Sequence, residues 1–405
     1  MSERRIPALE GDSVPLPVTL IGHPFASIGM GEQMRSHIAA CAAAGIDAGV
    51  LDVFRFAERG DPAHQALIGR RERESAAGGI RIFHVNGDEV ERALDSFARR
   101  GGDFDAGYNI VVPAWELPTY PEVWAEQLRR FDEVWALSGF IRDSLARAGL
   151  DSTLIGQSVE LPQGPFLPRR AFGVRESAFV LLQMFDLSSY ASRKNPTAGI
   201  ALFERLCSEQ PFLDIQLVLK VKDRDQDARA WADGLRPNPR LKVIAEPLDA
   251  FAVRSLIRAC DCFLSLHRAE GFGRGLGEAM SLGRLAMGTG WSGNLDFMTQ
   301  YNSLLVRHKL VKLKRSDYPH ARGQSWAEAD LDHAHALLTP ILRDPARGRE
   351  IALRGQADVF RTHGHRAVGL RILDRLETVA GTAVKSRPAT PVMPSERRRV
   401  RALSA

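Results

Sequence analysis

The stretch from Cys262 to Met298, CFLSLHRAEGFGRGLGEAMSLGRLAMGTGWSGNLDFM, decides the fold. It begins with a short apolar run, Cys262 to Leu266, of the length expected for a buried strand. A polar and glycine-rich turn follows, and the pattern then becomes helical through residues 276–282. A strand, a loop and a helix in this order predict one unit of an open, parallel α/β sheet.

The loop of this unit has the composition of an anion site. Its glycines leave backbone N–H groups free to face a phosphate at the start of the helix: Gly271, Gly273, Gly275 and Gly277. Glu270 lies where the loop leaves the strand, and Glu278 follows in the first turns of the helix. Two carboxylates repel a diphosphate but accept hydrogen bonds from hydroxyls, so one is expected to bind a hexose and the other a ribose. The alternative for Glu278 is ordinary stabilisation of a helix start.

The run HRAEGFGRGLGEAMSLG, with its Glu270-x7-Glu278 spacing, and the following TGWSGNLDFM resemble the donor site of family-4 retaining glycosyltransferases of the GT-B fold. The segments YNIVVPAWELPTYPEVW and FDEVWALSGFIRDSL resemble members that assemble polysaccharides. Arg274 departs from the family, because relatives usually carry an aliphatic residue there. The resemblance implies that the donor is bound by Gly29, Gly31, Gly271, Phe272, Gly273, Glu278, Ser292, Gly293 and Asn294.

Composition fits a globular chain of two domains. A length of 405 residues exceeds one comfortable core, and 44% of the residues are hydrophobic. No apolar run approaches the ~18 residues of a membrane span, and the N-terminus lacks the apolar segment of a signal peptide, so a cytoplasmic protein is expected. The four cysteines lack paired spacing, so neither zinc nor disulfides are predicted. A net charge of +5 is too modest to indicate nucleic-acid binding.

Strands alternate with helices along the chain, which predicts parallel, doubly wound sheets. With the resemblance, this implies an α/β protein of the GT-B fold, in which two Rossmann-like domains face a cleft and a C-terminal helix crosses back to the first domain. Residues 1–165 are expected to form the acceptor-side domain, and residues 166–355 the nucleotide-sugar domain after a proline-rich linker. A helix is expected through WAEADLDHAHALLTPIL, which begins at Trp326. Helices at 356–381 would cross back, and 382–405 would be a basic, disordered tail.

Candidate site residues follow three predicted strands of the first domain. Gly29 and Gly31 make a tight turn before a helix expected from near Glu32. Because the carboxyl ends of parallel strands share an edge, four further residues are candidates for the acceptor or sugar side of the cleft: His84, Asn86, Trp115 and Glu116. For His84 the alternative is a hydrogen-bonded core histidine.

Two cations open the second domain. Arg193 and Lys194 stand just before Asn195-Pro196, where proline is expected in the first turn of a helix. A guanidinium beside a mobile ammonium suits a diphosphate whose charge grows as it leaves. The resemblance implies the same role, and the alternative is a solvated surface pair.

The predicted function is retaining transfer of a hexose from a nucleotide-diphosphate sugar to a hydroxyl of a growing, lipid-linked glycan. The resemblance implies a front-face displacement with Glu270, Arg193 and Lys194 as catalytic residues, without metal or other cofactor. The alternatives are a nucleotide-sugar epimerase of the same fold and a non-catalytic sugar-nucleotide-binding protein. Basic pairs at 99–100 and 129–130 would suit peripheral contact with an anionic membrane at its inner face.

Overall fold

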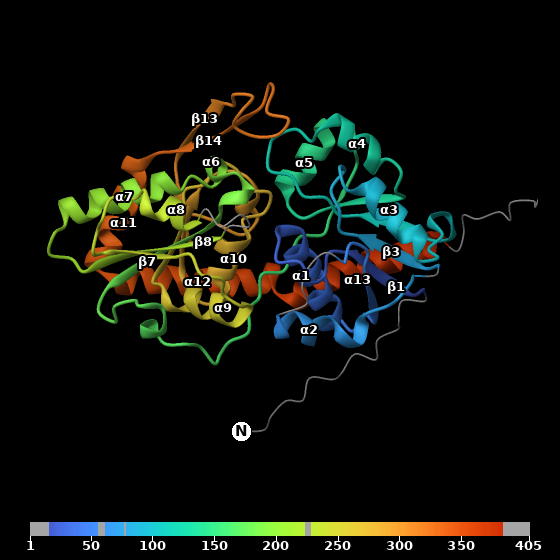
Figure 1. Ribbon diagram of the computed structural model, residues 1–405, viewed down its shortest axis with the longest axis horizontal. Coiled ribbons are helices and arrows are strands. Elements are labelled where there is room, and N and C mark those ends of the chain that lie inside the picture. The colour runs from blue at the N-terminus through green and yellow to red at the C-terminus, as the bar shows by residue number, and fades with distance from the viewer. Residues whose placement is uncertain (1–15, 56–60, 77, 223–227, 384–405) are drawn as a thin grey trace, which may run out of the picture.

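Two parallel six-stranded sheets form the framework of the protein (Figure 1). The computed structural model describes residues 16–55, 61–76, 78–222 and 228–383. Helices flank both sheets, so the predicted α/β fold class is confirmed. Among the described helices, none combines the length and the apolar composition that a membrane crossing requires.

The first lobe contains the sheet with strand order β2-β1-β3-β4-β5-β6. Its strands are β1 (Val18–Gly22), β2 (Ala48–Asp52), β3 (Ile80–Phe83), β4 (Tyr108–Val111), β5 (Glu133–Ala136) and β6 (Thr153–Leu154). Its helices are α1 (Gly29–Ala43), α2 (Pro62–Ile68), α3 (Val90–Arg99), α4 (Glu122–Leu128) and α5 (Gly139–Arg147). Every residue of β1 is buried, as expected for a parallel strand covered on both faces.

The second lobe contains the sheet with order β12-β11-β10-β7-β8-β9. Its strands are β7 (Phe179–Asp186), β8 (Ile215–Lys222), β9 (Leu241–Ile244), β10 (Cys262–Ser265), β11 (Leu285–Thr289) and β12 (Leu304–Val306). Its helices are α6 (Ala191–Lys194), α7 (Pro196–Glu209), α8 (Ala228–Asp233), α9 (Ala250–Ala259), α10 (Arg274–Ser281), α11 (Leu331–Arg343) and α12 (Pro345–His363). An antiparallel hairpin, β13 (His308–Lys312) and β14 (Ser325–Ala329), extends from this lobe.

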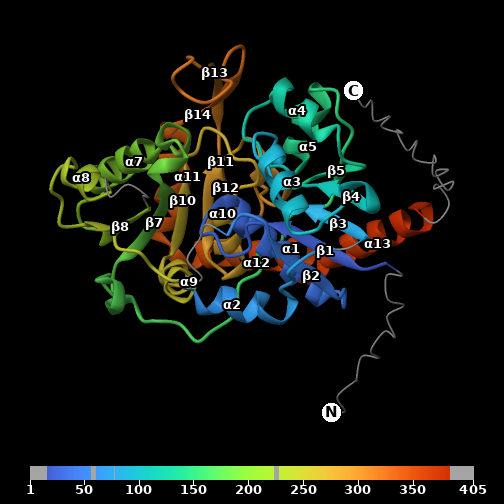
Figure 2. The same cartoon turned by 45° about the vertical axis from the view of Figure 1, so that its right-hand side comes forward.

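The last helix, α13 (His365–Ala383), lies against the first lobe (Figure 2). It packs on α1 so closely that a Cβ on Gly369 would come within 2.1 Å of the Ala40 carbonyl oxygen. Arg375 of this helix donates from Nε to Glu133 Oε1 at 2.7 Å. The predicted crossing of the C-terminal helix is therefore confirmed. The predicted boundary at residue 356 falls inside α12, and the chain leaves that helix at Gly364.

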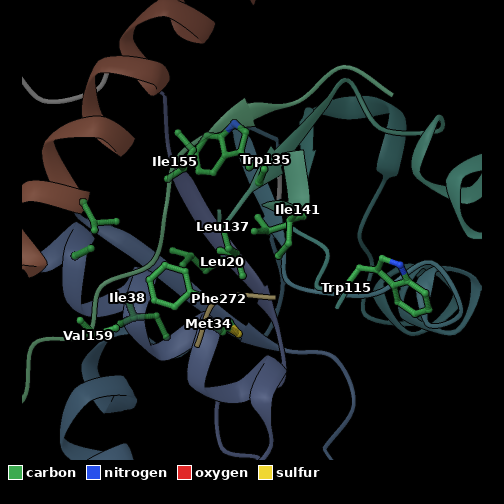
Figure 3. Packing of buried hydrophobic residues seen from close by; sticks show 14 of the residues in the cluster. Leu20, Met34, Ile38, Trp115, Trp135, Leu137, Ile141, Ile155, Val159 and Phe272 are labelled. Atoms are coloured by element: carbon green, nitrogen blue, oxygen red, sulfur yellow. The ribbon is translucent and has the colours of Figure 1, made fainter. Parts of the chain in front are cut away.

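The hydrophobic core runs from one lobe into the other. Phe272, from the loop between β10 and α10, inserts its ring among first-lobe residues near Met34 and Ile38 (Figure 3). Its side chain is 5% exposed, and its ring also lies 5.6 Å from that of His363 at the end of α12. Burial of a phenylalanine at this junction favours one fixed arrangement of the lobes.

Two sequence predictions about element boundaries were wrong. The helix expected from near Glu32 begins at Gly29, so the glycine turn forms its first turn. The stretch beginning at Trp326 was predicted to be helical, but residues 325–329 form β14. The helix starts only at Leu331, because the Asp330 side chain accepts a hydrogen bond from His333 N and caps it.

Candidate active site

A cleft of about 770 Å³ lies between the lobes, and both lobes supply its wall. Loops that follow the carboxyl ends of strands, where ligands of open α/β sheets bind, supply part of the wall, and residues of α1, α9 and α10 supply another part. First-lobe residues in it include Gly29, Asn86 and Glu116. The second lobe contributes Arg193, Lys194, Glu270, Gly271, Phe272, Gly273, Arg274 and Glu278.

The loop from β10 to α10 needs its glycines because other backbone lies close to it. A Cβ on Gly271 would lie 2.8 Å from the Trp115 carbonyl oxygen of the first lobe. Gly273 is the N-cap residue of α10 and has a φ of +88°, a conformation that side chains disfavour. Both glycines line the cleft at the start of α10, where backbone N–H groups suit an anion.

The turn Ser292, Gly293 and Asn294 supports this loop from behind. Ser292 Oγ accepts from Glu270 N at 2.9 Å, and Gly293 N donates to Glu270 O at 3.0 Å. A Cβ on Gly293 would collide with the Gly271 carbonyl oxygen at 2.0 Å. Asn294 Nδ2 donates to Thr289 O at 3.0 Å. These three described residues lie outside the cleft wall, so they fix the loop's shape instead of facing the cleft.

Glu270 is held by two cations at the floor of the cleft. Lys194 Nζ lies 2.5 Å from Glu270 Oε1, and Arg193 Nη1 lies 3.4 Å from Oε2. Burial alone would raise the pKa of Glu270, but the two cations outweigh it and lower the pKa to about 2. Arg193 is itself buried, and its Nη1 donates to Ala269 O at 3.0 Å. The carboxylate therefore stays charged and offsets one of the two positive charges.

Glu278 pairs with Arg274, one helical turn before it. Arg274 Nε lies 2.7 Å from Glu278 Oε1, and Arg274 Nη2 lies 3.5 Å from Glu32 Oε2 across the cleft. Burial raises the pKa of the Glu278 carboxyl above its ordinary value, and Arg274 offsets only part of this effect. Arg274, the unusual arginine of the sequence, thus joins α10 of the second lobe to the start of α1 in the first.

The two glycines at the start of α1 have different surroundings. Gly29 lines the cleft, and a Cβ there would meet no atom within 4 Å. Gly31 lies behind the cleft wall, where a Cβ would approach the Ala26 carbonyl oxygen to 2.1 Å. Gly31 is therefore required by the turn itself.

Two of the four first-lobe candidates line the cleft, and two are buried in the core. Asn86 and Glu116 line the cleft, and Asn86 Oδ1 accepts from Ala114 N at 2.8 Å. His84 is fully buried, and its Nδ1 lies 3.3 Å from Gln33 Nε2. Burial lowers the pKa of His84 well below its ordinary value, so it is a neutral core histidine. Trp115 is buried too, and its Nε1 donates to Thr119 O at 2.8 Å.

Several residues of the site were not predicted from the sequence. Glu32 and Gln33 line the cleft from α1, and Lys220 and Lys222 line it from the end of β8. The alternating lysines at the end of an apolar strand are the one local signal that could have indicated the last pair. Apolar side chains cover another part of the wall: Met184, Phe185, Leu248, Val253, Ile257 and Phe263.

In the part of the chain that the structure describes, no cluster of three or more His, Cys, Asp or Glu side chains could hold a metal ion. The acidic loop at 223–227 lies outside the described residues.

The chain has the GT-B fold, which it shares with the three solved structures described next. HepE from Anabaena, solved with UDP and glucose, shares 14% identity over 90% of this chain and 100% of its own, with a TM-score of 0.63. Sucrose-phosphate synthase from Thermosynechococcus elongatus shares 16% identity over 91% of this chain and 100% of its own, with a TM-score of 0.65. Trehalose 6-phosphate synthase from Burkholderia multivorans shares 10% identity over 91% of this chain and 100% of its own, with a TM-score of 0.59. No family model and no curated protein matches the chain.

Proposed function

We propose that this protein is a retaining glycosyltransferase that moves a hexose from a nucleotide-diphosphate sugar to a hydroxyl of a growing, lipid-linked glycan. The observation that carries the proposal is the cleft floor, where Arg193, Lys194 and the glycine-rich start of α10 surround Glu270. Cations and free amides suit a diphosphate, and a charged carboxylate beside them suits sugar hydroxyls. The UDP and glucose bound by HepE, a protein of the same fold, support this reading.

The donor would extend along the cleft in three parts. The base would lie against the apolar wall around Leu248 and Val253, and the ribose hydroxyls would donate to Glu278. The diphosphate would face Arg193 and Lys194, and the hexose would donate to Glu270. Because Glu278 now accepts from Arg274, ribose binding must share or replace that contact.

The proposed reaction is a front-face displacement without a metal. The bond from the anomeric carbon to the diphosphate oxygen breaks as the acceptor hydroxyl bonds to the same face of the sugar. The departing diphosphate takes the hydroxyl proton. Arg193, Lys194 and the amides of Gly271 and Gly273 would stabilise the growing negative charge, while the closed lobes exclude water.

The lipid-linked acceptor implies contact with a membrane surface, which we include in the proposal. Arg130 is exposed at the end of α4, where it could face anionic lipid. Its neighbour Arg129 is less available, because its Nη1 donates to Glu122 Oε1 at 2.9 Å.

Proton NMR of the anomeric region tests the proposed function. The protein is incubated with UDP-, GDP- or ADP-glucose and a panel of alkyl glycoside acceptors, without divalent metal. A new glycoside with the donor's anomeric configuration supports retaining transfer, whereas an isomerised donor indicates an epimerase. Binding without any product indicates a sugar-nucleotide-binding protein. Lys194→Ala should abolish transfer, while Lys309→Ala, an exposed lysine on β13, should leave it unchanged.

A further inference from the structure

The β13–β14 hairpin connects the second lobe to the first. The segment between its strands, residues 313–324, ends at Gln324, whose side chain pairs with the backbone of Thr119 in the first lobe. Gln324 Nε2 donates to Thr119 O at 2.7 Å, and Gln324 Oε1 accepts from Thr119 N at 3.1 Å. Figure 1 shows the hairpin at the top of the molecule, beside the gap between the lobes. The hairpin therefore fixes the loop that carries Glu116.

Tyr318 of this hairpin donates a hydrogen bond directly to a residue of the cleft wall. Its hydroxyl donates to Glu116 Oε2 at 2.7 Å. The Tyr318 ring lies 5.7 Å from that of Trp115 and 4.7 Å from that of Tyr190, and it is 7% exposed. The guanidinium of Arg193 lies 5.9 Å from the ring centre. A ring held on three sides has little freedom, so its hydroxyl fixes the carboxylate's orientation.

The other oxygen of Glu116 lies on the side of Arg193. Glu116 Oε1 lies 3.8 Å from Arg193 Nη2, and Arg193 Nη1 lies 3.4 Å from Glu270 Oε2. A single guanidinium thus lies between a carboxylate of each lobe. The Glu116 side chain keeps 22% of its surface exposed, in the cleft wall. A carboxylate accepts about four hydrogen bonds, so Glu116 retains capacity for a hydroxyl.

We propose that Tyr318 is a positioning residue that orients Glu116 to accept a hydrogen bond from a hydroxyl of the donor hexose. The inference rests on the proposed function. A carboxylate repels the diphosphate, whereas hexose hydroxyls are donors that suit Glu116 and Glu270 on either side of Arg193. This sugar subsite exists only when the hairpin lies across the first lobe, because each lobe supplies one part of it.

The test compares the binding of a nucleoside diphosphate with that of its sugar. Calorimetry gives the dissociation constants of UDP and UDP-glucose, and of the GDP and ADP pairs, for wild type and Tyr318→Phe. The phenylalanine keeps the ring and removes only the hydroxyl. The dissociation constant of the nucleoside diphosphate divided by that of its sugar measures how much the sugar adds to affinity. We expect Tyr318→Phe to lower this ratio about fivefold to tenfold and to leave nucleoside diphosphate binding within about twofold.

Three further variants separate positioning from folding. Glu116→Gln should lower the ratio at least as much, and adding Tyr318→Phe to it should cause no further loss, because both changes remove one coupled contact. Tyr108→Phe is the matched control, since the Tyr108 hydroxyl lies 3.5 Å from Glu133 Oε2, outside the cleft wall. It should leave the ratio unchanged.

Three results would overturn the inference. The first is an unchanged ratio in Tyr318→Phe, even if the variant melts earlier, and the second is additivity of the two substitutions. The third is that the wild type binds the sugar nucleotide no more tightly than the nucleoside diphosphate. In that case the cleft still binds a nucleotide, but the inferred sugar contact is absent. If wild type binds none of these compounds, the proposed function fails together with the inference.

Discussion

Replacing Glu270 by glutamine should lower the stability of the protein. It should also increase the amount by which added pyrophosphate stabilises the protein. Glu270 lies 2.5 Å from Lys194 and 3.4 Å from Arg193, and its side chain is only 12% exposed. Its pKa falls from the ordinary 4.5 to about 2. That difference corresponds to about 3 kcal/mol of interaction between the carboxylate and its surroundings. We therefore expect Glu270→Gln to lower the free energy of unfolding at pH 7 by about 3 kcal/mol.

The pH dependence has a defined sign. Because the folded-state pKa of Glu270 lies below its unfolded value, this contribution is complete above about pH 4.5 and is lost as the pH falls toward 2. In Glu270→Gln, Arg193 and Lys194 lack this counter-charge, and an anion that binds only the folded state should restore stability.

The assay is urea unfolding with and without a fixed concentration of pyrophosphate, in the wild type and the variant. Pyrophosphate should raise the unfolding free energy of Glu270→Gln by more than that of the wild type. Glu133→Gln is the matched control, because Glu133 pairs with Arg375 at 2.7 Å outside the cleft wall. It should lose stability without gaining sensitivity to pyrophosphate. Equal or smaller stabilisation of Glu270→Gln would refute the assignment of these cations to a diphosphate.

Three further changes test the core, the loop and a buried histidine. Phe272→Ala should cost about 3 to 5 kcal/mol in urea unfolding, since the ring is buried between the lobes; a loss below about 1 kcal/mol would contradict this. Gly271→Ala should weaken donor binding in calorimetry, because its Cβ would lie 2.8 Å from the Trp115 carbonyl oxygen; unchanged affinity would count against the close approach. Burial lowers the pKa of His37 to about 4. The unfolded state therefore takes up this proton first, and stability should fall by about 3 kcal/mol between pH 6.5 and 4. His37→Gln should remove that loss in unfolding curves across this range, and a persistent loss would assign it elsewhere.

The fold could be predicted where its signals are local. The apolar run, the glycine turn and the amphipathic pattern around Glu270 predicted β10 and α10, because period and turn chemistry are encoded in adjacent residues. Asn195-Pro196 similarly indicated the helix start beside Arg193 and Lys194. That these cations surround Glu270 follows from the topology, since parallel strands end at one edge.

Contacts between distant residues could not be predicted in the same way. Tyr318 and Glu116 are 202 residues apart, and the hairpin that joins them has a mixed, lysine-rich pattern without a clear period. Arg274 was recognised as unusual, but its partner Glu32 belongs to the other lobe. His84 follows a strand whose end reaches the cleft edge, yet its own side chain turns into the core. The direction of a side chain at a strand end depends on the register of the strand. The sequence pattern predicts where the strand lies but does not fix its register to within one residue.

The most direct test of the account is calorimetric titration of UDP-, GDP- and ADP-sugars, without divalent metal, into wild type, Glu278→Gln and Glu328→Gln. Glu328 is the matched control, because it pairs with Arg268 at 2.7 Å in the same lobe but outside the cleft wall. We predict that the wild type binds sugars of one nucleotide, that Glu278→Gln weakens this binding about tenfold or more, and that Glu328→Gln leaves it unchanged. Absence of binding to the wild type, or equal affinity in Glu278→Gln, would contradict the assignment of this cleft to a nucleotide sugar.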